Sequence, residues 1–578
     1  MLGDRWITDT TPTERFPNYT RGNAGEVLAD PVSPLGWTFC CEPGMVVGCV
    51  DGFEAMGVFD RSEYGTPPET FGMFGGYFYN SLTQARLFGV RSGAGWQAID
   101  NTYFDSTQTI PPYVEEPWHI SPRHSEKLAN TMAWIMSTDS VPEIDLQKSE
   151  AKACRDSRPD LATQSNEQLV ARARVLQRHM RAMFSQVVWG ALGASVGPAV
   201  LSALTGEMDP TATTKLITGV GDVDSAEIAG RMFELSRLVR KSAGLTAEFD
   251  KGIVGLLDRL RGSAGVDTDA QQFLVEVENF IYEHGSRGPN EYDIYSWSYE
   301  TKPELVLSSV ERLRHADDDA DPLRGEAAGS AERERLAEHF RSVFAGNAEA
   351  LGTFEAALQS AGVFMAARER CKCNNIRTIA EVRMCFYEIG RRMVDAGHLA
   401  HKRQICMLLA GEVDAYMDAP ASFKSVLAER EVDYLSLYDL EPPYIVDKAA
   451  PPLSQWQRKS EMTIVQVKVG DVLRGVAGSP GVATGIARVL LDLSDPFRLE
   501  VDDILIAPQT DPAWTPLFLS AGAVITNVGA VGTHAVIVSR ELGIPCVPSI
   551  PDATRRIPDG ATITVDGSNG TVTIVALP

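Results

Sequence analysis

One histidine stands in a sequence context that favours phosphoryl chemistry. His534 lies within residues 526–547, which read TNVGAVGTHAVIVSRELGIPCV. An imidazole nitrogen is a competent covalent nucleophile at neutral pH. The residues after it predict a helix that begins at His534, continues to about Glu541 and is ended by Gly543 and Pro545. The free N–H groups and the positive dipole end of such a helix favour an anion, including a phosphoryl group on the imidazole.

The residues just before the histidine predict how this helix starts. Gly532 supplies a flexible turn, and Thr533 is the candidate N-cap. The alternative for a lone histidine at a helix start is a structural role, in the core or as part of the cap. Residue type alone leaves both possibilities open for His534.

The motifs around His534 resemble the phosphohistidine swivelling domain of phosphoenolpyruvate-utilising enzymes. They are Gly478-Ser479-Pro480-Gly481 followed by Gly485, Thr510–Phe518 (TDPAWTPLF), and the stretch 526–547. Within that last stretch, Ala530 replaces a glycine of the family signature, Thr533 a serine, and Val536 and Ser539 alanines. By this resemblance His534 is the phosphoryl carrier, and Thr533, which keeps a hydroxyl, keeps the capping role.

Composition sets limits on the class of protein. A chain of 578 residues exceeds what one core holds, so at least two domains are expected. The net charge of −24, without a basic run, argues against nucleic acid or an anionic membrane as a partner. Nine cysteines form neither a disulfide framework nor a metal-site spacing, so we expect a reducing cytoplasm and no bound metal. The first residues have no apolar signal-peptide core.

The pattern along the chain predicts a multidomain α+β protein. Residues 1–120 read as mixed structure with β-like runs at 45–50 and 76–82, and residues 121–447 as mainly helical. Residues 183–204 predict a buried helix interrupted near Pro198 rather than a membrane span. The acidic segment 314–335 predicts an exposed connector. A Pro-containing linker at 448–470 separates this large acceptor-substrate domain from a small β/β/α swivelling domain at 471–578.

The N-terminal body also resembles the acceptor-substrate domain of rifampicin phosphotransferase-like members of the family. The stretches that carry this resemblance are 23–35, 74–80, 285–291 and 367–397. By position in these stretches, Arg287, Arg370 and Lys372 are candidates for holding the phosphoryl group during transfer. The alternative is that each pairs with a nearby carboxylate, as most Arg and Lys side chains do.

The same families place an ATP-grasp domain before the acceptor domain and, in some members, a pyruvate-binding barrel after the histidine domain. No Gly-rich phosphate loop precedes residue 20 in this sequence. The layout resembles the histidine subunit of phenylphosphate and methylphenyl phosphate synthases. That resemblance implies a separate ATP-grasp subunit that uses ATP and Mg²⁺, and transfer from His534 to a phenolic hydroxyl. The products would be an aryl phosphate, AMP and phosphate.

A phenol acceptor requires an apolar pocket and a general base. Aromatic residues are dense at 37–104, enough to wall an aryl pocket, although most are expected to be ordinary core residues. The candidates for the base are His119, His124, His284, Glu26 and Glu291. Two other functions stay open: transfer to an antibiotic or another natural-product hydroxyl, and a non-catalytic phosphocarrier or regulatory module.

Overall fold

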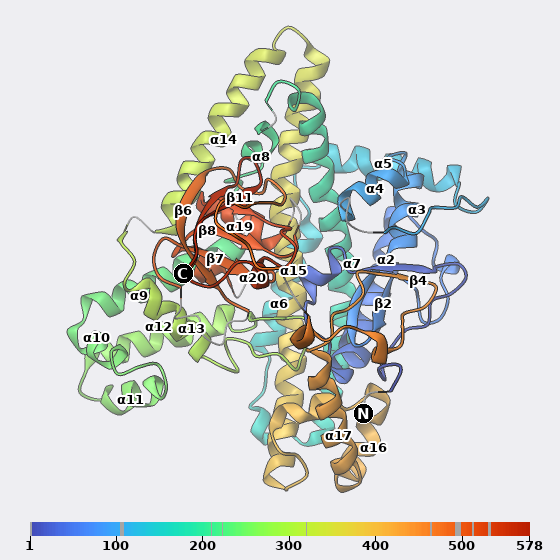
Figure 1. The fold of residues 1–578 in the computed structure, drawn as a ribbon. Helices are drawn as coiled ribbons and strands as arrows, with labels where there is room; N and C mark the ends of the chain where they lie inside the picture. The colour runs from blue at the N-terminus through green and yellow to red at the C-terminus, as the bar shows by residue number, and fades with distance from the viewer. Residues whose placement is uncertain are drawn as a thin grey trace. The chain divides into compact units, whose positions relative to one another are not determined.

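The structure is a computed structural model (Figure 1), which describes residues 3–104, 109–209, 211–221, 224–318, 321–462, 465–491, 499–510, 514–529 and 533–578. Its contacts divide the chain into two compact units. The N-terminal unit comprises residues 1–200, 290–296 and 353–462, and the C-terminal unit comprises residues 201–289, 297–352 and 463–578. The predicted class, a large mainly helical part and a small β-rich part, is confirmed.

The N-terminal unit combines one small sheet with many helices. Its strands are β1 (Asn18–Thr20), β2 (Phe71–Phe74), β3 (Tyr77–Ser81) and β4 (Ile445–Asp447). Its shorter helices are α1 (Ala24–Val27), η1 (Gly36–Val46), α2 (Val47–Met56), η2 (Arg61–Glu63), α3 (Leu82–Ser92), α4 (Trp96–Tyr103), α5 (Pro122–Ser137), α6 (Pro142–Asp156), η3 (Leu161–Thr163), η5 (Lys402–Met407), η6 (Ala410–Glu412), α16 (Val413–Asp418), η7 (Pro420–Phe423), α17 (Lys424–Leu437), η8 (Leu453–Gln455) and η9 (Lys459–Glu461). The two long helices of the chain are α7 (Asn166–Thr205) and α15 (Ala348–Asp395).

The sheet of this unit is antiparallel, in the order β2-β3-β1-β4. Its hairpin turns at Gly75 and Gly76, which both have positive φ, as a two-residue turn between twisted strands requires. The strand predicted near 76–82 is therefore confirmed as β3. Because Tyr19 of β1 pairs with Val446 of β4, the two ends of the unit's sequence meet in this sheet.

Part of the predicted linker belongs to this unit. Leu453 and Trp456 are buried, and the Trp456 indole N–H donates to the Pro451 carbonyl at 2.9 Å. Lys459 Nζ donates to the Tyr438 carbonyl at 3.1 Å. Residues 448–462 thus pack on the N-terminal unit, and the chain between 462 and β5 (Val472–Arg474) is short.

Three local predictions are wrong. The run at 45–50 is helical in η1 and α2, where Gly48 and Gly52 approach the backbone of α7 at Arg181 and Ser185. The run 314–335 becomes helical at Pro322, the first residue of α14 (Pro322–Phe344), because Pro suits a first helical position and the residues after it are good helix formers. α7 continues through Pro198 without interruption.

Glycines on α7 allow this helix to pack closely on α15. Cβ atoms at Gly190 and Gly197 would meet the α15 backbone at Arg368 and Ala361, and one at Gly193 would overlap the Phe364 ring. Small residues let the two helix axes approach closely. One 18-residue window of α7 has a mean hydropathy of 1.7, so this helix is long and apolar enough to cross a membrane, as the core helices of soluble proteins can also be.

The C-terminal unit holds a helical bundle and a β-rich domain. The bundle helices are α8 (Ala212–Leu216), α9 (Asp224–Lys241), α10 (Ala243–Phe249), α11 (Leu256–Ser263), α12 (Thr268–His284), α13 (Glu304–Leu313) and α14. Helices α9 to α13 bury one apolar cluster that includes Met232, Phe273 and Val310. α9 and α12 lie within residues 121–447, which the sequence predicts to be mainly helical.

The β-rich domain is a seven-stranded sheet in the order β5-β11-β10-β6-β7-β8-β9. Its elements are β5, β6 (Val482–Val489), β7 (Asp503–Ala507), α18 (Thr515–Phe518), β8 (Ala521–Thr526), α19 (His534–Leu542), β9 (Cys546–Val547), α20 (Ala553–Arg556), β10 (Thr562–Asp566) and β11 (Thr571–Ala576). β6 to β9 are parallel neighbours, and the other pairs are antiparallel. Figure 1 draws this domain in orange and red.

Alternation along the central strands gives this domain two cores. Ile504 and Ile506 of β7 join the cluster that includes α20, whereas Leu505 and Ala507 join the cluster that includes α18 and α19. Side chains of successive strand residues point to opposite faces, so each face of the sheet is buried under its own helices. The core of the second cluster thereby fixes α19 against β7 and β8.

Candidate functional site: a histidine at a helix N-terminus

The histidine site lies where two parallel strands end. β7 ends at Ala507 and β8 at Thr526, and these two residues are paired. Thr510 follows β7, while the chain after β8 leads to His534, the first residue of α19. The carboxyl ends of parallel strands meet at one sheet edge, which is where open α/β sheets bind ligands. The helix start predicted at His534, and its end at Gly543 with a φ of +70°, are confirmed.

Two threonine hydroxyls hold the imidazole from both sides. Thr510 Oγ1 lies 3.0 Å from His534 Nδ1, and Thr515 Oγ1 lies 3.1 Å from Nε2. The Phe518 ring contacts the imidazole edge-on, with 5.8 Å between the ring centroids. Both threonines are buried, so these contacts fix the ring plane and its rotation. The TDPAWTPLF stretch supplied the signal for these three residues, to which the sequence pattern by itself gave no role.

This arrangement is suited to a nucleophilic imidazole. A neutral imidazole has one N–H donor and one lone pair, while each hydroxyl can donate or accept. One threonine therefore accepts from the N–H and sets the tautomer, and the other donates to the nucleophilic nitrogen. A reaction at that nitrogen requires only that its threonine hydroxyl turn away.

Thr533 occupies the N-cap position of α19, but its hydroxyl does not cap the helix. Its side chain forms no cap hydrogen bond, and Oγ1 is buried without a hydrogen-bond partner among the described residues. The predicted capping role of the side chain is therefore wrong, although the position is right. A buried hydroxyl beside the first-turn N–H groups suits an oxyanion next to His534. The turn predicted at Gly532, like Ala530, lies outside the described residues.

The glycine-rich motif at 478–481 anchors the other end of the helix. Arg540 of α19 donates from Nε to the Gly478 carbonyl at 3.0 Å. Ser479 and Cys546 exchange backbone hydrogen bonds, at 3.2 and 3.1 Å. Burial lowers the pKa of Arg540 to about 10, so it stays charged at neutral pH. These contacts tie α19 to β9 and hold His534 at a fixed place on the sheet edge.

The other predicted site residues are divided between the two units. Arg287 and His284 belong to the C-terminal unit, whereas Glu26, Glu291, Arg370 and Lys372 belong to the N-terminal unit. Arg370 pairs with Asp145 at 2.5 Å, as the alternative for this residue predicted. Lys372 lies on the same helix, α15. Glu26 lies in α1, and its side chain is outside the described part of the structure.

The stretch around Arg287 is a buried loop. Arg287 follows α12, and its backbone carbonyl accepts from the Tyr299 N–H at 2.8 Å. His284 ends α12 and stacks near Phe280, with 5.1 Å between ring centroids. Glu291 is buried, and its backbone carbonyl accepts from Arg383 at 3.1 Å. A phosphate-binding or acid–base role for these residues stays a prediction.

The remaining base candidates lie in the N-terminal unit. His119 is buried, with Nδ1 2.8 Å from the Tyr113 hydroxyl and 3.1 Å from the Glu116 N–H. His124 faces two carboxylates instead. All nine cysteines are free, in agreement with the absence of a disulfide framework in the sequence.

Comparisons with known proteins agree with this site. Residues 499–570, which include His534, match the family model "PEP-utilising enzyme, mobile domain", and residues 179–369 match "rifampicin phosphotransferase fourth domain". A phosphoenolpyruvate synthase of Aeropyrum pernix is 40% identical over 151 residues, or 25% of this chain and 18% of that protein. A rifampicin phosphotransferase of Streptomyces sviceus is 26% identical over 371 residues, covering 63% of this chain and 41% of that protein.

A longer alignment joins the chain to a protein without an assigned function. An uncharacterized protein of Mycobacterium tuberculosis is 25% identical over 98% of this chain and 63% of its own length. The chain thus spans less than two thirds of the relatives it matches. Through its histidine-bearing domain, the chain resembles the phosphoenolpyruvate-utilising enzymes, and these matches support that relationship. Within them, the chain resembles rifampicin phosphotransferase.

Proposed function

We propose that this chain is a phosphotransferase that carries a phosphoryl group on His534 and passes it to a hydroxyl acceptor. The observation that carries the proposal is the imidazole at the start of α19, held by Thr510 and Thr515 beside the unpartnered Thr533 hydroxyl. The first-turn N–H groups and the helix dipole stabilise the charge of the carried phosphoryl group. The similarity to rifampicin phosphotransferases and to an uncharacterized phosphotransferase of Bacillus subtilis supports the same chemistry.

The reaction has two displacements at phosphorus. In the first, an imidazole nitrogen of His534 forms a P–N bond while the P–O bond to the donor breaks. In the second, the acceptor oxygen forms a P–O bond, the P–N bond breaks, and the hydroxyl proton passes to a base. Positioning and charge neutralisation supply most of the catalysis in such transfers. The donor in this proposal is ATP, bound with Mg²⁺ by an ATP-grasp subunit on a separate chain.

For the acceptor we propose a phenol, which yields an aryl phosphate. With ATP as the donor, one P–O bond of its polyphosphate chain breaks in the transfer to His534 and water cleaves the other in a separate hydrolysis step, so the other products are AMP and inorganic phosphate. Aromatic side chains in the N-terminal unit support an aryl acceptor. Phe71 is partly exposed and lies against Phe78 and Phe184, at centroid distances of 4.9 and 6.1 Å. Such an edge offers the stacking that holds a planar ring.

A second acceptor class is an antibiotic hydroxyl. The match to a rifampicin phosphotransferase over 63% of the chain favours it. The two acceptors share the His534 step and differ only in the second displacement. One experiment therefore tests the shared step and separates the acceptors.

The experiment is an isotope exchange that needs no nucleotide. The purified chain is incubated with unlabelled phenyl phosphate and ¹⁴C-phenol, and label is followed into phenyl phosphate. A phosphohistidine relay exchanges label, because His534 takes the phosphoryl group from the ester and returns it to labelled phenol. His534→Ala should abolish the exchange, with His339→Ala, a histidine of α14, as the matched control.

Each outcome decides a part of the proposal. Exchange that survives His534→Ala would refute the relay. If exchange occurs only between rifampicin and its phosphate ester, the phenol acceptor is wrong and the antibiotic class is right. If neither pair exchanges, the acceptor classes are both wrong. Labelling of His534 from β-³²P-ATP with a purified ATP-grasp partner would then test the first displacement separately.

A further inference from the structure

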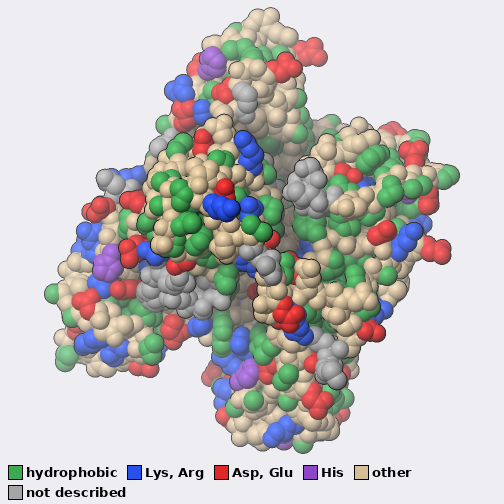
Figure 2. Space-filling model, viewed as in Figure 1, with side chains coloured by type: hydrophobic (Ala, Val, Ile, Leu, Met, Phe, Trp, Pro, Cys, Tyr) green, Lys and Arg blue, Asp and Glu red, His purple; other side chains and the backbone are tan. Residues whose placement is uncertain are grey.

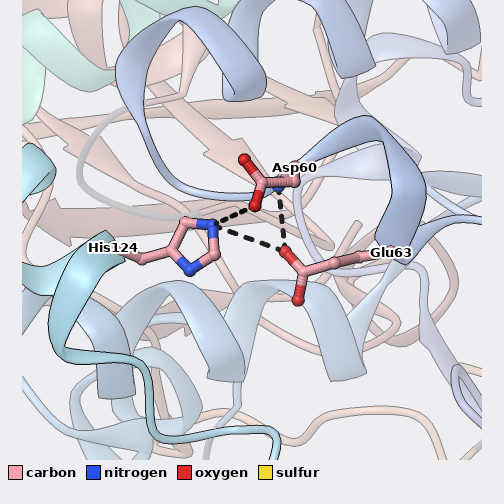
Figure 3. Close-up of side chains that lie close together, drawn as sticks. All are labelled: Asp60, Glu63 and His124. Carbon is pink, nitrogen blue, oxygen red and sulfur yellow. Dashed lines mark hydrogen bonds and ion pairs between the residues drawn. The ribbon is translucent and has the colours of Figure 1, made fainter.

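Two carboxylates and a histidine converge in the N-terminal unit, in a cluster that the phosphoryl chemistry does not use. Asp60 and Glu63 flank the short turn η2, and His124 lies in the first turn of α5 (Figure 3). The Asp60 N–H donates to Glu63 Oε2 at 2.9 Å, which fixes the two carboxylates relative to each other. Three potential metal-ligand atoms, one from each residue, lie within 4.8 Å of one another.

The His124 imidazole is oriented by its other ring nitrogen. Nδ1 lies 2.7 Å from Ser121 Oγ, and Nε2 faces the carboxylates, as Figure 3 shows. Nε2 is 3.4 Å from Asp60 Oδ2 and 3.6 Å from Glu63 Oε2. His124 is only 5% exposed, and among the described residues Nε2 has no hydrogen-bond partner. A buried polar atom in this state calls for a ligand.

These separations fit metal ligands better than they fit hydrogen bonds. A charge-assisted N–H···O bond is about 2.7 to 2.9 Å long. Ligand atoms around a tetrahedral zinc ion lie about 3.3 to 3.4 Å apart, given bonds of about 2.0 to 2.1 Å. A histidine ligand also donates its other N–H to an oxygen, the role that Ser121 Oγ fills for His124. A modest rotation of the Asp60 side chain would also bring its carboxylate oxygen to this separation from the Glu63 oxygen.

The charges around the cluster set the conditions for binding. Arg91 is 1% exposed and donates to both oxygens of Glu63, at 2.7 and 3.0 Å. It remains a fixed partner that orients this carboxylate from behind.

A second arginine, Arg123, would compete with a metal ion for the Asp60 carboxylate. Arg123 donates to both oxygens of Asp60, at 2.9 and 3.0 Å, and its side chain is 64% exposed. Lys127 approaches the same carboxylate at 4.0 Å, and Arg15 approaches Glu63 at 3.4 Å, both from exposed positions. Exposed ion pairs of this kind contribute little, so a divalent ion can displace Arg123 into solvent.

We propose that Asp60, Glu63 and His124 bind a divalent transition-metal ion, zinc first, which fastens η2 to the start of α5. Two carboxylates and one imidazole leave a fourth position for water, and this borderline donor set favours zinc over magnesium. Because the site joins a loop to a helix, binding should stabilise the N-terminal unit. The site is independent of the phosphoryl relay at His534.

The test uses metal binding itself as the readout. The full chain, freed of metal with a chelator, is titrated with ZnCl₂ by calorimetry, and with CoCl₂ by visible absorption. We expect one equivalent to bind, with a rise in thermal stability. His124→Gln should weaken zinc binding at least tenfold, whereas His315→Gln, which removes an exposed histidine beside Glu311, should leave it unchanged.

The competing arginine gives a second, opposite prediction. Arg123→Gln should tighten zinc binding roughly threefold to tenfold, because it removes the positive charge that competes for Asp60 and leaves all three proposed ligands in place. If His124→Gln does not fold, the Arg123→Gln variant still tests the proposal. Absence of binding, affinity unchanged in His124→Gln, or weaker binding in Arg123→Gln would each overturn the proposal. Magnesium binding in place of zinc would overturn the choice of metal class.

Discussion

At the scale of single residues, the side chains around His534 have two separate roles: some orient the imidazole, and another can hydrogen-bond an oxyanion. Thr510 and Thr515 orient the imidazole, and the buried hydroxyl of the preceding residue, Thr533, has no hydrogen-bond partner in the part of the chain that the structure describes. Orientation contributes to rate because only one ring nitrogen reacts. We expect an oxyanion bound at the start of α19 to give the Thr533 hydroxyl a hydrogen-bond partner. These tasks can be separated by substitution.

Thr510→Val and Thr515→Val should have unequal effects on phosphorylation of His534. The threonine on the non-reacting nitrogen sets the tautomer, so its loss should slow transfer roughly tenfold to a hundredfold. The threonine on the reacting nitrogen must turn away in any case, so its loss should matter less. Nitrogen–phosphorus coupling in the NMR spectrum of the labelled phosphoprotein identifies the reacting nitrogen. Equal, negligible effects of both variants would contradict this division.

Thr533→Val should slow phosphorylation without lowering stability. A buried hydroxyl without a partner costs free energy, so replacing it by a methyl group of the same shape should leave stability equal or slightly higher. The same change removes a donor for the phosphoryl oxygens. Thr533→Ser should restore the rate. Thermal unfolding and single-turnover labelling measure the two effects, and a variant that loses both stability and rate would argue for a structural role.

At the scale of elements, glycines on α7 decide how closely the two longest helices pack. Gly193 lies where any Cβ would overlap the Phe364 ring of α15, and Gly197 lies close to the Ala361 backbone. The apolar stretch at 183–204 is therefore a helix-packing face as well as a hydrophobic segment. Pro198 sits inside α7 and does not end it.

Gly193→Ala should lower stability, although alanine is the better helix former. Overpacking typically costs about 1 to 3 kcal/mol, which exceeds the helix-propensity gain of about 0.8 to 1 kcal/mol. Gly352→Ala is the matched control, since Gly352 lies on α15 and a Cβ there would meet nothing within 4 Å. It should raise stability by about 0.5 to 1 kcal/mol. Chemical denaturation of both variants measures the change in the free energy of unfolding. A more stable Gly193→Ala variant would contradict the prediction, because it would show that α15 shifts to accommodate the added methyl group.

At the scale of the whole molecule, acidic residues outnumber basic ones, 77 against 53. Figure 2 shows acidic and basic side chains interspersed over the visible face. The net charge of −24 accords with the expectation of a small-molecule or protein partner rather than nucleic acid. Cytoplasmic location and the ATP-grasp partner remain proposals. Within the N-terminal unit, the partly buried Asp9 carboxyl gives stability a pH dependence.

Asp9 should make the N-terminal unit less stable as pH rises from about 4 to 6. Burial raises the pKa of Asp9 from 3.8 to about 6, although its carboxylate accepts from the Trp6 and Gly76 N–H groups. Because the folded pKa is the higher one, the unfolded chain releases its proton first, and stability is lost until the pH passes 6. The loss amounts to about 2 to 3 kcal/mol.

Asp9→Asn should remove this loss, and the exposed Asp139→Asn should not. Urea titrations at pH 4, 5, 6 and 7, followed by tryptophan fluorescence, measure the difference. Parallel pH profiles for the wild type and Asp9→Asn would contradict the assignment.

The sequence by itself indicated the candidate histidine and determined several local elements. The helix at His534, its end at Gly543, the β-rich C-terminal runs and strand β3 all follow from local turn residues and periodicity. Turn residues and periodicity act over a few neighbouring residues, so they predict these elements without knowledge of tertiary contacts. The roles of the acceptor-domain candidates could not be predicted in the same way. Arg and Glu residues have the same local sequence pattern in ion pairs and in binding sites. Arg370, which pairs with Asp145, illustrates this.

Only the tertiary structure decided the long-range features. Residues 45–50 look like a strand but are helical, because Gly48 and Gly52 let α2 pack on α7. Thr533 looks like a cap but leaves its hydroxyl unpartnered, and Thr510 and Thr515 meet His534 only once β7, α18 and α19 are folded. The cluster of Asp60, Glu63 and His124 joins residues about 60 positions apart. Such contacts depend on packing between segments, which no local pattern encodes.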